Sequence, residues 1–175
     1  MEENKELEKL FSISEKDYGN SYKDQLFEQY KIYLKMIDKL SDRRANANSF
    51  FLSISTGLLA ALGVLFNDSI THSPNYVLLF VGSIGGILFC YTWVRTVKSY
   101  RQLSSGKWKI VIEIEKKIPL SLHETEWKIL GEGKNKSLYK PITDIEQIVP
   151  RIFLGIYAIL ILISILPQIS QIMKL

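Results

Sequence analysis

Three uncharged, strongly apolar runs separate the charged segments of this 175-residue chain. They cover residues 48–66, 76–94 and 152–173. Each run has about the length of a helix that crosses the hydrocarbon layer of a bilayer, which takes about 20 residues. The charged residues gather outside these runs instead of recurring at helix or strand period. This pattern predicts an all-α membrane protein with three transmembrane helices and polar extensions, rather than a soluble domain.

A heptad pattern precedes the first apolar run. The chain has neither Gly nor Pro from Ser21 to Thr56. Apolar side chains recur there at alternating spacings of four and three residues, namely Leu26, Tyr30, Tyr33, Ile37 and Leu40. This spacing is typical of a helix that packs along another helix. It predicts one helix from about Ser21 to about Phe66, whose part at 21–47 is a cytosolic amphipathic helix continuous with the first span. Residues 1–20 are predicted to form a flexible polar tail.

Small residues mark one face of each of the first two spans. The first span carries Ser53, Gly57 and Ala61, and the second carries Gly82 and Gly86. Small side chains let membrane helices approach closely, because lipid supplies no hydrophobic drive for their association. We expect these two faces to pack on each other, within one chain or between neighbouring chains.

Basic residues flank the cytosolic ends of the spans. Lys and Arg precede the first span and follow the second, whereas the connection at 67–75 has none. The positive-inside rule therefore places the N-terminus and the region 95–151 in the cytosol, and the loop 67–75 and the C-terminus outside. Four polar residues, Arg43, Arg44, Asn46 and Asn48, fall at the cytosolic boundary of the first span.

The cytosolic region 95–151 is harder to interpret. The second helix is predicted to end near Leu103, before a turn at 104–106. Residues 107–118 alternate like a strand, but they also place Trp108 and Glu115 on one helical face. We favour a helix, since no second strand is available for pairing. Trp108, Glu115 and Trp127 are expected to anchor this region.

A capping signal opens the last helix. Thr143 and Glu146 have the spacing of a capping box, in which the two side chains bond reciprocally to backbone amides. Pro150 is expected to kink that helix, because proline removes a helical hydrogen bond. The third span then follows at 152–173.

Little in the sequence indicates chemistry. Cys90 is a single cysteine, and His123 with Glu124 and Glu126 lacks a second histidine at the spacing of zinc sites. The net charge is +4, with Lys and Glu interleaved, and no nucleic-acid module is evident. We expect no enzyme activity, no metal, no cofactor and no nucleic-acid partner.

A set of short motifs in a fixed order resembles a known family. The motifs are Ser41-x-Arg43-Arg44-x-x-Ala47-Asn48-x-Phe50-Phe51, Tyr100-Arg101-x-Leu103, Lys107-Trp108-Lys109, Ile114-Glu115-x-x-Ile118-Pro119, Glu126-Trp127, Tyr139-x-Pro141-x-Thr143-x-x-Glu146 and Val149-Pro150. Over about residues 25–165 the chain resembles the RipA family of small octameric proteins of the bacterial cytoplasmic (inner) membrane. The resemblance implies a homo-octamer in a lipid bilayer and a role in proliferation inside host cells. It implies no catalytic residues.

These observations support three hypotheses. The first is a non-enzymatic, homo-oligomeric membrane scaffold or channel-like assembly, in which the polar residues at 43–48 either anchor helices or line a cavity. The second is a membrane-disrupting effector of a bacterial defence or toxin system. The third is a hydrolase or nuclease that uses His123 with Glu124 or Glu126.

Overall fold

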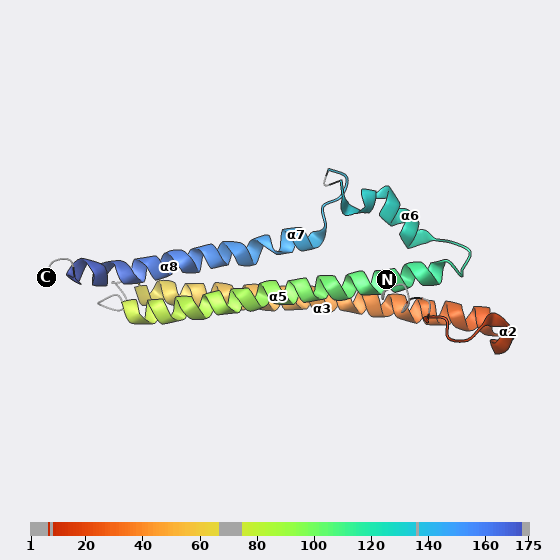
Figure 1. The fold of residues 1–175 in the computed structure, drawn as a ribbon. Coiled ribbons are helices and arrows are strands. Elements are labelled where there is room, and N and C mark those ends of the chain that lie inside the picture. Colours follow the sequence, from red (N-terminus) through yellow and green to blue (C-terminus); the bar gives the residue numbers. More distant parts are fainter. Residues whose placement is uncertain (1–6, 8, 67–74, 136, 173–175) are drawn as a thin grey trace. The chain divides into compact units, whose positions relative to one another are not determined.

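The computed structural model describes residues 7, 9–66, 75–135 and 137–172, and the regular structure of these residues is entirely helical (Figure 1). The predicted all-α fold is confirmed. Three helical segments are long and apolar enough to cross a membrane, within α3 (Tyr22–Phe66), within α5 (Tyr76–Glu115) and at Asp144–Pro167. The remaining elements are α2 (Glu15–Tyr18), α6 (Leu122–Ile129), the 3-10 turn η1 (Gly131–Gly133), α7 (Ile142–Glu146) and α8 (Ile148–Ile172). The predicted external loop at 67–75 lies outside the described residues except for Asn75.

Helix α3 has 45 residues, so it is about 68 Å long at 1.5 Å per residue. It joins the heptad segment to the first apolar run without a break, as the absence of Gly and Pro before Gly57 indicated. Only about 30 Å of this length can lie in hydrocarbon. The segment before α3, which we expected to be a tail, contains α2, and the Ser14 hydroxyl of its N-cap accepts a hydrogen bond from the Asp17 amide.

Helix α5 also continues beyond its apolar run. The predicted turn at 104–106 is wrong, because these residues lie inside α5, which ends at Glu115. The helical interpretation of 107–115 is confirmed and the strand alternative is excluded. The packed side chains of Val97 and Val111 flank the Ser-Ser-Gly sequence on both sides. Their tertiary contacts outweigh the modest helix-breaking tendency of Ser and Gly, which costs about 1 kcal/mol for a glycine.

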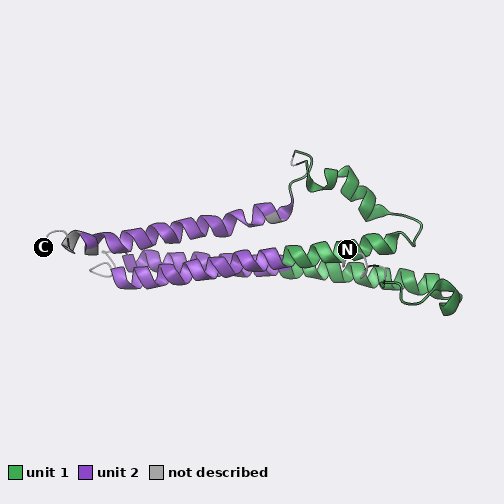
Figure 2. Ribbon diagram, in the orientation of Figure 1, with its two compact units in different colours: residues 1–43, 100–140 green, residues 44–99, 141–175 purple. Residues whose placement is uncertain are grey.

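The chain divides into two compact units, which Figure 2 shows in different colours. Unit 1 comprises residues 1–43 and 100–140. Its core contains Tyr30 and Ile37 from α3 and Val111 and Ile114 from α5. The heptad seam of α3 therefore packs against α5 of the same chain, and the two helices run antiparallel.

Unit 2 comprises residues 44–99 and 141–175 and contains the three apolar runs. Leu62, Leu79, Cys90 and Tyr157 form its larger core cluster, so α3, α5 and α8 all contribute. Tyr157 is completely buried, and its hydroxyl donates a hydrogen bond of 2.9 Å to the Ser55 carbonyl. This bond links α8 to α3 and satisfies a polar group that lipid could not serve.

The small residues have other neighbours than we expected. An ideal Cβ at Gly82 would lie 2.5 Å from a methyl group of Leu62, and one at Gly86 would lie 2.5 Å from the Tyr157 ring. In contrast, Ser53, Gly57 and Ala61 are exposed, and a Cβ at Gly57 would meet nothing within 4 Å. Within one chain the two small-residue faces therefore do not meet. We refer to Ser53, Gly57 and Ala61 as the α3 stripe.

We predict that Gly86→Ala destabilises unit 2, whereas Gly85→Ala does not. The added methyl at residue 86 overlaps the buried aromatic ring of Tyr157, and overpacking of this kind typically costs about 1–3 kcal/mol. Gly85 is the matched control, since it is exposed and a Cβ there meets nothing within 4 Å. Denaturant titration in mild detergent measures both free energies of unfolding. Equal stabilities for the two variants would contradict the packing of Tyr157 on Gly86.

The chain breaks its helix before Pro150. A turn at Gln147 separates α7 from α8, and Pro150 is the third residue of α8. The missing amide hydrogen is harmless in the first helical turn, because that turn has no helical acceptor for it. Where we expected a kink at Pro150, the structure has an interruption at Gln147, between α7 and α8. The side chain of Thr143, the other half of the expected capping box, lies outside the described residues.

Candidate functional site

A polar cluster joins three helices of unit 2. The Glu146 carboxylate at the end of α7 accepts hydrogen bonds from the Arg44 guanidinium and from Asn48 Nδ2, the latter at 2.9 Å. Asn48 Oδ1 in turn accepts a bond of 2.9 Å from Trp93 Nε1 of α5. We refer to Arg44, Asn48, Trp93 and Glu146 as the Arg44–Glu146 cluster.

The local sequence explains why these side chains meet. Arg44 and Asn48 are one turn apart on α3, so they share a face. They stand at the start of the first apolar run, Trp93 stands near the end of the second, and Glu146 precedes the third. The side chains of Arg44 and Glu146 are only 18% and 20% exposed, and their charges are opposite. The cluster is therefore a partly buried, neutral group of charge-assisted hydrogen bonds.

The other two polar residues predicted at this boundary lie elsewhere. Arg43 and Asn46 are exposed, and the structure does not bring them into the Arg44–Glu146 cluster. Of the four residues predicted as a ring or anchor, two bond within the chain and two face outward. The sequence had indicated only a capping role for Glu146. The signal for the ion pair is the position of the two residues. Glu146 lies just before the third apolar run and Arg44 just before the first, so opposite charges stand at the start of two spans.

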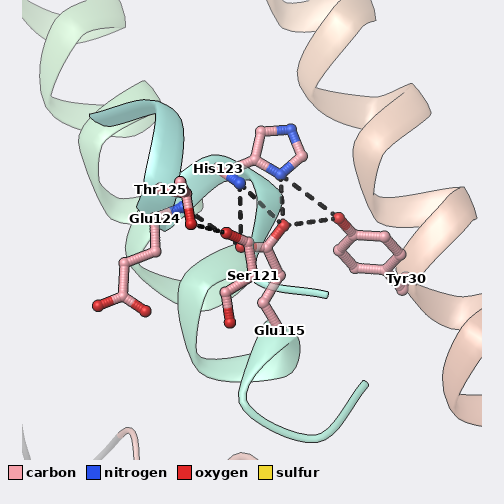
Figure 3. Close-up of polar contacts among 6 residues, drawn as sticks. All are labelled: Tyr30, Glu115, Ser121, His123, Glu124 and Thr125. Carbon is pink, nitrogen blue, oxygen red and sulfur yellow. Dashed lines mark hydrogen bonds and ion pairs between the residues drawn. The ribbon is translucent and has the colours of Figure 1, made fainter. Parts of the chain in front are cut away.

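A second polar cluster lies in unit 1, around the buried carboxylate of Glu115 (Figure 3). Glu115 is only 1% exposed. Its Oε1 accepts a hydrogen bond of 2.9 Å from the Tyr30 hydroxyl and lies 2.6 Å from Nδ1 of His123. The backbone amides of His123 and Glu124 also donate to this carboxylate. We refer to Tyr30, Glu115 and His123 as the Glu115 cluster.

The electrostatics of this cluster favour an ionised Glu115. Burial raises the pKa of the carboxyl, but hydrogen bonds from His123, Tyr30 and the Glu124 amide lower it further than burial raises it. The pKa of Glu115 therefore lies below its ordinary value. Burial, together with the bond to Glu115, raises the pKa of Tyr30 to about 12. An ionised carboxylate can only accept, so the proton between Glu115 and His123 belongs to Nδ1 of the ring.

We predict that the ionised Glu115 carboxylate stabilises the folded protein near neutral pH and that this contribution is lost in acid. Because the pKa of Glu115 is depressed in the folded state, its contribution is complete above the ordinary value of 4.5 and is lost as the pH falls through the lower folded-state pKa. Glu115→Gln should lower the free energy of unfolding by about 1.5–3 kcal/mol near neutral pH, the usual worth of a hydrogen bond to a charged group. The gap between the two proteins should narrow below pH 4.5. Denaturant titrations across this range test it, with the partly exposed Glu113→Gln as the control. A pH-independent gap would contradict the assignment.

A pocket of about 390 Å³ adjoins the Glu115 cluster. Its α5 wall consists of Ser105, Trp108, Lys109 and Ile112. His123, Glu126, Trp127 and Leu130 of α6 and its C-cap form the opposite wall, and Tyr139 completes the lining. Both helices present residues at the spacing of one helical face, so the pocket lies between two adjacent faces. We refer to it as the α5–α6 pocket.

The three residues that we expected to anchor this region, Trp108, Glu115 and Trp127, lie in three different environments. Glu115 is buried and holds the start of α6. Trp108 packs on the His123 ring at a centroid distance of 4.8 Å. Trp127 is 42% exposed and meets the Tyr139 ring edge-on at 6.4 Å. His123 pairs with Glu115 rather than with its neighbours Glu124 or Glu126, the partners considered from the sequence. Glu115 shares a face with Trp108, and a charge on an apolar face is the signal that could have indicated a buried partner.

The described residues hold no group of three or more His, Cys, Asp and Glu side chains placed to bind a metal ion. A sequence model of the octameric membrane protein family (8xMP) matches residues 27–166, which is most of the chain. No curated protein and no solved structure matches.

Proposed function

Because the chain belongs to the octameric membrane protein family, we propose that it acts as a homo-octameric membrane scaffold without enzyme activity. The observation that carries this proposal is the Arg44–Glu146 cluster. A channel lined by polar rings needs side chains that are directed to the axis and available to ions. Here Arg44 and Asn48 bond to Glu146 and Trp93 of the same chain. They act as anchors between helices of one subunit.

The α3 stripe is the proposed contact between subunits. Glycine in a helix costs about 1 kcal/mol relative to alanine, and packing in the protomer does not require Gly57. Large apolar side chains beside the stripe, such as Leu52 and Ile54, are also exposed. Small residues on an exposed membrane face are typical of helix association between chains. The octameric family supplies copies of the same chain as the partner.

The orientation and location also belong to the proposal. The distribution of Lys and Arg supports a cytosolic N-terminus, a cytosolic region 95–151 and an external C-terminus. Unit 1 would then form the cytosolic part of each subunit. The resemblance to the RipA family supports the bacterial inner membrane as the location and growth inside host cells as the process that the scaffold serves.

Native mass spectrometry in mild detergent, together with expression in the producing cell, tests this function. We expect an octamer that cells tolerate at high expression. A monomer at every concentration would contradict the scaffold. Growth arrest that follows membrane leakage on overexpression would instead support the membrane-disrupting effector.

A further inference from the structure

The α5–α6 pocket has the composition of a binding site for a positively charged organic molecule. Trp108, Trp127 and Tyr139 contribute three aromatic rings to its lining. The face of an aromatic ring is electrically negative and attracts cations. A volume of about 390 Å³ lies near the lower end of the range for small-molecule sites, roughly 300–1,000 Å³.

Glu126 adds a full negative charge to this lining. In the part of the chain that the structure describes, no cation pairs with its carboxylate. The neighbouring acids differ, because Glu124 pairs with Lys128 at 2.6 Å and Glu113 pairs with Lys116 at 2.5 Å. Glu126 is therefore the acid of this region whose charge is available to a ligand.

His123 contributes its imidazole ring to the lining. Its Nδ1 is held by Glu115, and Figure 3 shows the second ring nitrogen on the side of the ring away from that carboxylate. Glu115 is buried, so the orientation of His123 is fixed before any ligand arrives.

Lys109 also lines the pocket and carries a positive charge. The experiment must therefore test whether the pocket prefers a cation or an anion. Three aromatic rings and the carboxylate of Glu126 favour a cation over an anion. We propose that the α5–α6 pocket binds a small organic cation, such as a quaternary or protonated amine. The site lies within unit 1 and is independent of the octameric scaffold proposed above.

Calorimetric titration of the intact protein in uncharged detergent tests this assignment. The probe is choline, and its comparison compounds are 3,3-dimethylbutan-1-ol, which has the same shape without charge, and 3,3-dimethylbutanoate, which is an anion. We expect choline to bind at least tenfold more tightly than either compound. Equal or tighter binding of the alcohol or the anion, or no binding of choline at millimolar concentration, would overturn the proposal.

Matched variants locate the site. Glu126→Gln and Trp127→Leu should each weaken choline binding by about tenfold, while Glu113→Gln should leave it unchanged. Glu126 and Trp127 are exposed, so we expect both variants to fold, and circular dichroism verifies this. Equal weakening by Glu113→Gln would overturn the site. A loss of subunits in Glu126→Gln, measured by native mass spectrometry, would show that a neighbouring copy fills the pocket and would also overturn it.

Discussion

Gly57→Leu should convert the octamer into smaller species. The leucine side chain would project from the centre of the α3 stripe, where a Cβ at residue 57 meets nothing beyond its own stretch of helix within 4 Å. The protomer itself therefore accommodates the residue, and helix propensity even favours it. Between subunits the same side chain would separate two helices that small residues allow to approach closely. Native mass spectrometry of the purified protein measures the change in subunit number.

Gly63→Leu is the control for this experiment. Gly63 lies in the same helix and is exposed, and a Cβ added there would meet nothing within 4 Å. It is turned about 120° away from Gly57 around the helix axis, so it lies off the α3 stripe. We expect Gly63→Leu to remain octameric. An octamer in both variants would place the subunit contact on another face of the protein.

Glu146→Leu should destabilise unit 2 by about 2–4 kcal/mol, somewhat less than the 3–5 kcal/mol that removing one partner of a fully buried ion pair typically costs. The substitution leaves the Arg44 guanidinium partly buried without its carboxylate, and Asn48 Nδ2 loses its acceptor. About one fifth of each charged side chain is exposed, which reduces the cost. Denaturant titration in mild detergent gives the free energy of unfolding.

The double variant Arg44→Leu with Glu146→Leu tests whether the two residues stabilise unit 2 as a pair. Once both charges are gone no charge is left unpaired, so the double variant should be more stable than Glu146→Leu alone. Exposed Arg43 provides the control, since Arg43→Leu should change stability little. If the single and double variants were equally unstable, Arg44 and Glu146 would not act as a pair.

The long helices could be predicted from the sequence because their signals are local. Apolar runs of membrane length and the heptad spacing at Leu26–Leu40 require no knowledge of distant contacts. The turn expected at 104–106 failed for the opposite reason. Ser-Ser-Gly is a local turn signal, and packing between α5 and α3 in unit 1 overrides it.

The site could be predicted only in part. Arg44 and Asn48 were singled out because polar residues at a membrane boundary commonly anchor a helix, join helices or line a cavity. Their partner Glu146 is about 100 residues away in sequence, and only the fold brings it within bonding distance. The same holds for Tyr30, which joins Glu115 across 85 residues. Gly82 and Gly86 were predicted to pack on the small-residue face of the first span, whereas their neighbours Leu62 and Tyr157 depend on a helix register that the sequence does not reveal.

Ion flux through liposomes that contain the verified octamer tests the scaffold most directly. If the Arg44–Glu146 cluster anchors helices within each subunit, flux should equal that of empty liposomes for the natural protein. Arg44→Glu and Asn48→Leu should then lower stability without creating a conductance. A flux well above the empty control, with an ion selectivity that changes in Arg44→Glu, would contradict the scaffold and identify these residues as the lining of a pore.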